Sequence, residues 1–107
     1  RGASLTGAVR FAALPVIDEA RALVQDGVAT GASTRNWASY GASVTLPADA
    51  PEWQRKLVTD PQTSGGLLIA CAADTVDAVQ AAISAEQGAP GVVIGEMRAG
   101  AARVLVG

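Results

Sequence analysis

The sequence predicts a single α/β (α+β) domain, a mixed β-sheet of about five strands with helices packed on it. Three observations support this class. Several short segments alternate apolar residues with small or polar ones, as strands with one buried face do. Longer segments place apolar residues three or four positions apart and end at glycine, as amphipathic helices do. The two kinds of segment alternate along 107 residues, a length typical of one domain.

The first two elements are expected before residue 30. Alternation at residues 5–11 predicts a strand. The segment LPVIDEARALVQDG, residues 14–27, predicts a helix, because Pro15 suits a first turn, two acidic residues follow it and Gly27 can end it. Its apolar face would consist of Val16, Ala20, Leu23 and Val24.

The middle of the chain predicts a loop, a strand and a helix. Residues 28–43 are rich in Gly, Ser and Thr, which indicates a structured loop. Alternation at residues 42–46 predicts a short strand. The segment 50–58 has a proline near its start and stacks Trp53 and Leu57 four positions apart, so we expect a short helix there.

The remaining residues predict three more strands and one helix. The apolar run GGLLIACA, residues 65–72, favours a strand covered on both faces. A helix is expected from Asp74 to about Gln87, ended by Gly88, with an inward face of Val76, Val79 and Ile83. The last two strands, GVVIGEM and ARVLV, are expected to form a hairpin through the turn RAGA.

Composition excludes several classes of function. The formal charge is −2 with no basic cluster, so nucleic acid is not an expected partner. No apolar run is long enough to span a bilayer. The chain has no histidine, which removes the commonest general base and metal ligand. A single cysteine fits a reducing compartment, and we expect a cytoplasmic protein. The chain opens at Arg1 without a methionine or a signal pattern, so a fragment of a longer protein is expected.

Two polar segments could carry chemistry, TGASTRN (Thr30–Asn36) and TDPQTSGG (Thr59–Gly66). Each offers hydroxyls and backbone amides from which an anion site can be built. Arg35 adds a guanidinium that suits a phosphate. Neither segment fits a nucleotide-binding fingerprint, since both lack the required glycine and lysine spacing. From the residues alone, turn chemistry remains the alternative for both segments.

Simpler interpretations apply to the other conspicuous residues. Asp60 precedes a proline and suits the start of a turn rather than a metal site. Cys71 ends an apolar run without a basic neighbour, which predicts a small buried side chain. Ser64 has no histidine to activate it, so a serine hydrolase is excluded. Trp37 and Tyr40 are expected to pack over the sheet edge.

The stretch TDPQTSGGLLIAC, residues 59–71, resembles the signature of the selenophosphate synthetase (selenide, water dikinase) family. The signature lies in the C-terminal domain that these enzymes share with AIR-synthase-related proteins. Asp60–Leu68 match it without a gap. Three further segments resemble the family in the same order: LPVIDEARALVQDG, GASTRN and VIGEM. One departure is Ala32, which stands where the family commonly has a second glycine.

This resemblance implies that residues 1–107 are the AIR-synthase-related C-terminal domain of an enzyme that makes selenophosphate from selenide, ATP and water, releasing AMP and phosphate. It implies that ATP and Mg²⁺ are held mainly by a separate N-terminal ATP-binding domain, which also forms most of a homodimer. No catalytic residue and no metal ligand is expected in this chain, which alone would be inactive. The residues expected to face the phosphates are Thr34, Arg35, Asn36, Thr63, Ser64, Gly65 and Gly66.

Two alternatives to the selenium enzyme remain at this stage. Another ATP-dependent member of the AIR-synthase family, such as thiamine-monophosphate kinase or a purine-pathway synthetase, shares parts of the signature. An upstream glycine-rich segment containing Cys or selenocysteine and then a lysine would distinguish the selenium enzyme. The other alternative is a free-standing, non-catalytic interaction domain, which should leave no large apolar surface uncovered.

Overall fold

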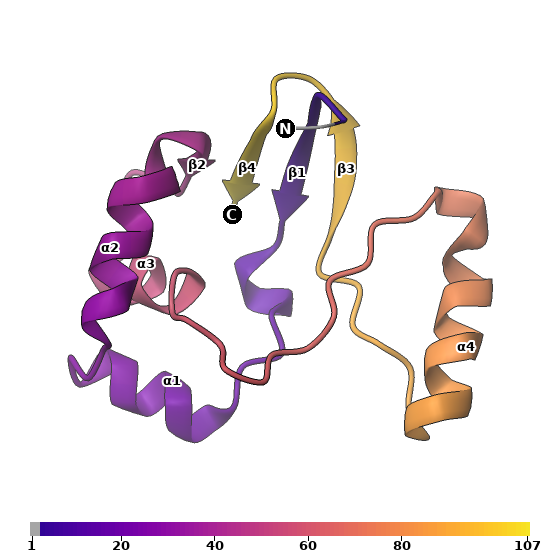
Figure 1. Ribbon diagram of the computed structural model, residues 1–107, viewed down its shortest axis with the longest axis horizontal. Helices are drawn as coiled ribbons and strands as arrows, with labels where there is room; N and C mark the ends of the chain where they lie inside the picture. Colours follow the sequence, from indigo (N-terminus) through magenta and orange to yellow (C-terminus); the bar gives the residue numbers. More distant parts are fainter. Residues whose placement is uncertain (1–2) are drawn as a thin grey trace.

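The computed structural model describes residues 3–107 and confirms a mixed α/β architecture (Figure 1). In this part of the chain one sheet contains four strands, rather than the five expected, in the order β2-β4-β1-β3. Central β1 is parallel to β4 and antiparallel to β3, and β4 is also parallel to β2. The strand bounds are β1 Leu5–Val9, β2 Val44–Thr45, β3 Gly95–Ala99 and β4 Arg103–Val106.

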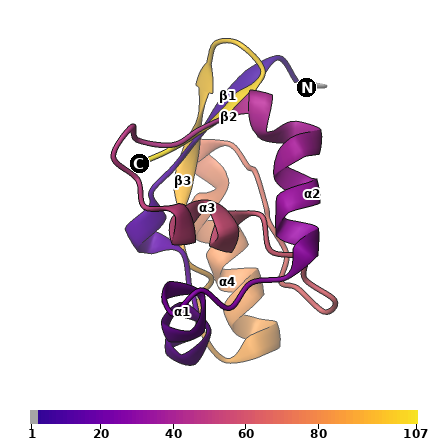
Figure 2. The ribbon, with the colours of Figure 1, turned by 90° about the vertical axis from the view of Figure 1, so that its left-hand side faces the viewer.

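Within residues 3–107 four α-helices flank this sheet, three on its β2 side and one on its β3 side (Figure 1). Their bounds are α1 Asp18–Gln25, α2 Gly31–Tyr40, α3 Glu52–Val58 and α4 Val76–Gln87. Three 3₁₀ turns accompany them: η1 Phe11–Ala13, η2 Gly41–Ser43 and η3 Ala73–Thr75. Helix α3 packs against both α1 and α2, whereas α4 stands apart on the β3 side, reached by a long irregular segment (Figures 1 and 2).

Helices α1 and α4 form close to where their patterns predict them. The chain stays extended through Ile17, so α1 begins with Asp18 and Glu19 in its first turn, and Pro15 lies before the helix. The expected apolar face is only partly buried, because Val24 is in the core while Leu23 remains 53% exposed. Helix α4 ends at Gly88 in the left-handed conformation, as its pattern predicts.

The expected loop at residues 28–43 is wrong, since most of it is helix α2. Thr30 is the N-cap of this helix, and its side-chain oxygen accepts a hydrogen bond from the Ser33 amide. Side chains of Ser33 and Asn36 are bonded to the chain around the end of α3. These tertiary contacts favour helix in a segment whose Gly, Ser and Thr residues have little intrinsic preference for it.

The expected strand at residues 65–72 is also wrong. This run has no regular secondary structure, and Leu67 and Leu68 are 92% and 83% exposed. A strand requires a neighbouring strand for its backbone hydrogen bonds. Within residues 3–107 the run pairs with no strand, and both sides of β1 are occupied by β3 and β4. Cys71, expected to be buried in this strand, is therefore exposed.

The expected hairpin of the last two strands is replaced by a three-stranded arrangement. Strands β3 and β4 are neighbours in sequence, yet β1 lies between them and pairs with both. Gly95 makes this possible, because a Cβ at that position would lie 2.0 Å from the Ala8 carbonyl oxygen. Beyond β3, the Thr6 hydroxyl donates to the Ala101 carbonyl and fixes the connecting turn to β1.

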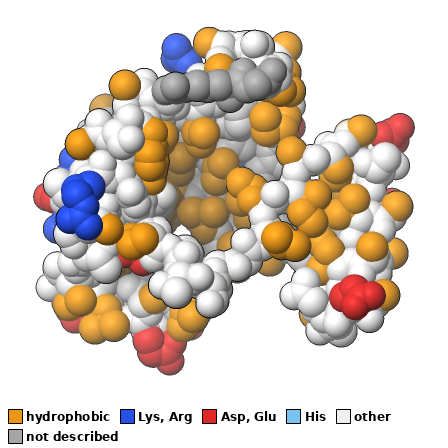
Figure 3. All heavy atoms as spheres, in the orientation of Figure 1, with side chains coloured by type: hydrophobic (Ala, Val, Ile, Leu, Met, Phe, Trp, Pro, Cys, Tyr) orange, Lys and Arg blue, Asp and Glu red, His pale blue; other side chains and the backbone are white. Residues whose placement is uncertain are grey.

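The buried apolar core is small. Its hydrophobic members are Phe11, Val24 and Val106, and Phe11 meets Trp53 of α3 edge-on with ring centroids 5.5 Å apart. This aromatic contact joins the end of β1 to the helical side. Figure 3 shows apolar side chains lining an open hollow between that side of the molecule and α4. Much of the apolar surface is therefore left uncovered in this chain.

Candidate functional site

The structure brings the first parts of the two polar motifs together. The Thr30 hydroxyl donates to Asp60 Oδ1 at 3.2 Å. The Asn36 amide donates to the Thr59 carbonyl at 2.8 Å. Two motifs about thirty residues apart in sequence are thus joined where α2 packs beside the end of α3. Their common position was not predicted, because the first motif was expected to be a loop.

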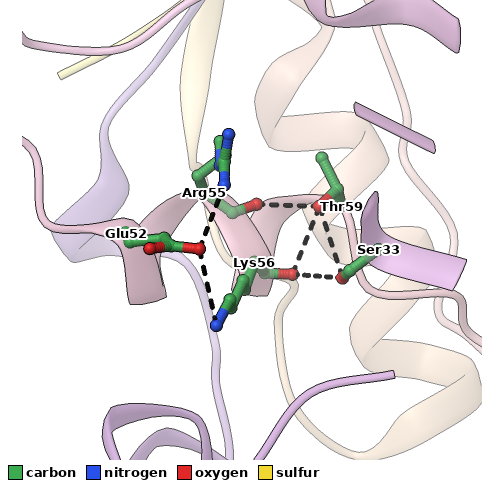
Figure 4. Close-up of polar contacts among 5 residues, drawn as sticks. All are labelled: Ser33, Glu52, Arg55, Lys56 and Thr59. Atoms are coloured by element: carbon green, nitrogen blue, oxygen red, sulfur yellow. Dashed lines mark hydrogen bonds and ion pairs between the residues drawn. The ribbon is translucent and has the colours of Figure 1, made fainter. Parts of the chain in front are cut away.

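A pair of buried hydroxyls forms the centre of this junction (Figure 4). Ser33 and Thr59 are each only 2% exposed. Ser33 Oγ donates to the Lys56 carbonyl at 2.7 Å, and Thr59 Oγ1 donates to the Arg55 carbonyl at 2.8 Å. Buried hydroxyls are costly unless bonded, so these contacts explain why both side chains can be enclosed. Sequence reasoning did not single out either hydroxyl, since their enclosure depends on the packing of α2 against α3.

Asp60 lies at the boundary between this junction and the exposed part of the second motif. Its Oδ1 accepts from Thr30 and its Oδ2 accepts from the Gln62 side-chain amide at 3.3 Å. Thr30 caps α2, and the N-terminal end of a helix favours a negative charge. Because the Asp60 carboxylate already occupies this position, a second anion there would meet a like charge. The beginning of α2 is therefore a poor place for a phosphate.

The predicted site residues fall into two groups. Asn36 is half-buried and bonded to the Thr59 carbonyl, so its side chain supports the junction. Thr34 and Arg35 are exposed on α2, and residues 63–66 are exposed beyond Asp60. Among the described residues no hydrogen bond joins residues 63–66 to residues 34–36. The structure thus joins the two motifs through Asn36 and Thr59 and leaves the other predicted phosphate-facing residues open to solvent.

A small hollow beside the junction contains basic and aromatic side chains. Its volume is about 20 Å³, room for roughly one water. Arg55 and Lys56 both approach Glu52 Oε1, at 3.1 and 3.5 Å (Figure 4). The Arg55 guanidinium also lies 5.5 Å from the Trp37 ring centroid. Each cation on this hollow is therefore already paired with the Glu52 carboxylate.

Two of the sequence expectations concern larger features. No group of three or more His, Cys, Asp or Glu side chains within residues 3–107 could hold a metal ion. In the same residues no helix is both long and apolar enough to cross a bilayer.

Trp37 packs against Gly41 and under Arg55, and Tyr40 is 40% exposed at the end of α2.

Comparison with known proteins gives one consistent result, although no protein-family model matches the chain. It is 50% identical over 106 residues to a selenide, water dikinase of Paraburkholderia xenovorans, a match that covers 99% of this chain and 30% of the relative. A selenide, water dikinase of Burkholderia pseudomallei is 54% identical over 104 residues, a match that covers 97% of this chain and 29% of the relative. A selenide, water dikinase of Rhizobium meliloti is 45% identical over 106 residues, a match that covers 99% of this chain and 30% of the relative.

The resemblance to the selenophosphate synthetases is confirmed. The chain spans about 30% of the length of these curated relatives. Because the matches cover 97–99% of the chain, the junction between the two polar motifs lies inside the region shared with the selenide, water dikinases.

Proposed function

We propose that this chain is the C-terminal domain of a selenophosphate synthetase. The complete enzyme makes selenophosphate from selenide, ATP and water and releases AMP and phosphate. The observation that supports this most directly is 45–54% identity to selenide, water dikinases over nearly the whole chain. The unbroken match of residues 60–68 to the family signature adds to it. The same resemblance implies a cytoplasmic, homodimeric enzyme.

In this proposal the chain supplies one wall of a shared cleft. ATP and Mg²⁺ are bound mainly by the N-terminal domain, and no step involves a metal held by residues 3–107, which contain no suitable cluster. The backbone amides of Ser64–Gly66, with the hydroxyls of Thr34 and Thr63, face the phosphates. All of these residues are exposed, so their donors are accessible. Donors fixed in position stabilise charge that develops on a transferring phosphoryl group.

Within the two motifs we distinguish side chains that position the backbone from side chains that face the phosphates. Asn36 holds the Thr59 carbonyl, and Asp60 holds both Thr30 and Gln62. We assign these two side chains to positioning, because each fixes the base of the second motif. Arg35 is exposed on α2 and has no ion-pair partner among the described residues, which leaves its guanidinium available to an anion.

The test uses the complete polypeptide and measures ATP turnover that depends on selenide. Thr63→Ala removes an exposed hydroxyl proposed to contact phosphate, and we expect turnover to fall about tenfold, as the loss of a hydrogen bond to a charged group does. The matched control is Thr45→Ala, which removes an exposed hydroxyl from β2. Unchanged turnover and unchanged ATP affinity for Thr63→Ala would remove this residue from the site.

The same assay addresses the alternatives. A thiamine-monophosphate kinase or a purine-pathway synthetase would consume ATP without any requirement for selenide. A free-standing interaction domain would show no ATP turnover, with or without selenide. The exposed leucines at 67 and 68 argue against the free-standing domain, because independent soluble domains rarely leave such apolar runs uncovered.

A further inference from the structure

A second hollow lies at the carboxyl edge of the three parallel strands. Strands β1, β4 and β2 run in the same direction, so their carboxyl ends meet at one edge of the sheet. The chain leaving each strand contributes to the wall, and α3 closes it. The lining residues are Phe11 and Ala12 after β1, Pro47, Asp49 and Ala50 after β2, Val106 and Gly107 at the end of β4, Pro51 at the N-cap of α3 and Gln54 within α3.

The position and size of this hollow are typical of a ligand site. Its volume is about 330 Å³, at the lower end of the range for small-molecule pockets, roughly 300–1,000 Å³. Ligands of open α/β sheets bind outside the carboxyl ends of the strands. None of the predicted phosphate-facing residues lines it, so this hollow is separate from the polar motifs.

The wall offers few hydrogen-bond donors. The amide of Phe11 donates to the Gly107 carbonyl, and the amide of Gly107 donates to the Val9 carbonyl. The amides of Ala50 and Gln54 are likewise bonded within their own turns. The two prolines have no amide proton. An anion would therefore find four of the wall's backbone amides already bonded within the chain.

The charged side chain that the described part of this wall offers is a carboxylate. Asp49 is exposed, and no hydrogen bond or ion pair is formed by its carboxylate within residues 3–107. No lysine or arginine within residues 3–107 lines the hollow. The nearest basic side chains in sequence, Arg55 and Lys56, pair with Glu52 and line the other hollow instead. Asp49 is thus the one ionisable side chain that the described residues place on this wall.

We propose that this hollow binds a small organic ammonium ion with an apolar body. The ammonium group pairs with the Asp49 carboxylate and donates to the Gln54 side chain. The apolar body rests mainly on Ala12 and the two prolines, with the small exposed parts of Phe11 and Val106 behind them. The restricted backbones of the prolines keep the wall in shape without a ligand. This site goes beyond the proposed selenium chemistry and does not depend on it.

The first experiment compares three probes of one shape by ligand-observed saturation-transfer NMR with the complete polypeptide. The probes are phenethylamine, 2-phenylethanol and 3-phenylpropanoate. We expect the amine to bind most tightly, the alcohol more weakly and the carboxylate least. Equal affinity for the amine and the carboxylate, or tighter binding of the carboxylate, would overturn the proposal. This comparison needs no variant, so it decides the proposal even if a substitution prevents folding.

The second experiment locates the binding. Asp49→Asn should weaken phenethylamine binding roughly two- to fivefold, the range for an exposed ion pair, and should leave 2-phenylethanol unaffected. Asp26→Asn is the matched control, because it removes an exposed carboxylate at the end of α1, outside the hollow. Ala12→Leu fills the hollow and should weaken both probes. Loss of amine binding in the Asp26 variant, or no loss in the Asp49 variant, would contradict the assignment. Selenide-dependent turnover is expected to be unchanged in all three variants.

Discussion

At the scale of single residues, the clearest feature is how α2 satisfies the end of α3. The last carbonyls of a helix have no partner within the helix. Here Ser33 donates to the Lys56 carbonyl, Thr59 donates to the Arg55 carbonyl, and Asn36 donates to the carbonyl of Thr59 just beyond the helix. Three short polar side chains therefore act as a C-terminal cap supplied largely by a neighbouring helix.

This cap gives a prediction for stability. Ser33→Ala should lower the free energy of unfolding by about 1–3 kcal/mol, because it removes the 2.7 Å hydrogen bond to the part-buried Lys56 carbonyl and leaves it only the longer contact with Thr59 Oγ1, at 3.3 Å. Ser39→Ala, an exposed serine of the same helix, is the control and should change stability by less than about 0.5 kcal/mol. Chemical denaturation of the two variants measures the difference, and equal midpoints would show that the cap contributes nothing.

Asp60 gives a second residue-scale prediction, about order rather than overall stability. Asp60→Ala removes the acceptor of both the Thr30 hydroxyl and the Gln62 amide. These contacts are exposed, so we expect a stability loss of only about 0.3–1 kcal/mol. Hydrogen exchange of the amides at residues 62–66 should become faster, while exchange in α3 stays the same. Faster exchange in both segments would instead indicate a general loss of packing.

At the scale of elements, local patterns predicted most helices and strands, and contacts distant in sequence decided the exceptions. Strand β1 and helices α1, α3 and α4 follow from apolar spacing and from Pro and Gly at their ends. Helix α2 was missed because its composition favours a loop. The Thr30 N-cap and the spacing of Ser33, Asn36 and Trp37 along one helix side were the available signals.

The placement of β1 between β3 and β4 could not be read from the sequence, because it depends on pairing over about ninety residues. The candidate site shows the same limit. The motif residues were identified from their pattern, but the bonds of Thr30 to Asp60 and of Asn36 to Thr59 require α2 to lie on α3. Sequence thus identifies the chemistry of the motifs, and packing determines which of their residues remain free.

Gly95 tests the pairing of β1 with β3. Gly95→Ala places a Cβ about 2.0 Å from the Ala8 carbonyl oxygen, which the backbone cannot accommodate without moving. We expect a loss of roughly 1–3 kcal/mol or more in unfolding free energy, the usual cost of overpacking. Gly31→Ala is the matched control, since its added Cβ would meet only the Arg35 side chain at an ordinary 3.6 Å. If the two variants unfolded at the same denaturant concentration, the close approach of β1 and β3 would be contradicted.

At the scale of the whole molecule, the chain leaves unusual apolar surface uncovered. The core has few buried hydrophobic residues, and Leu67, Leu68, Val92 and Val93 are all largely or half exposed. Figure 3 shows apolar side chains on both sides of the open hollow beside α4. The curated relatives are more than three times as long as the region they share with this chain, which accords with a domain that is covered by further polypeptide.

That surface predicts the behaviour of the isolated 107-residue chain. It should bind a hydrophobic fluorescent dye and self-associate on size-exclusion chromatography, because exposed apolar runs promote both. The double variant Leu67→Ser with Leu68→Ser should reduce dye binding, whereas Val28→Ser, an exposed apolar residue beyond α1, should reduce it less. A compact monomer without dye binding at high concentration would favour a free-standing domain.

In the proposed function this chain is the C-terminal domain of a selenophosphate synthetase and is inactive without the rest of the enzyme. The most direct test of this proposal is AMP formation from ATP, measured with and without selenide, for the complete polypeptide and for the 107-residue chain alone. The account predicts selenide-dependent AMP formation by the complete polypeptide and none by the isolated chain. AMP formation that ignores selenide, or turnover by the isolated chain, would contradict it.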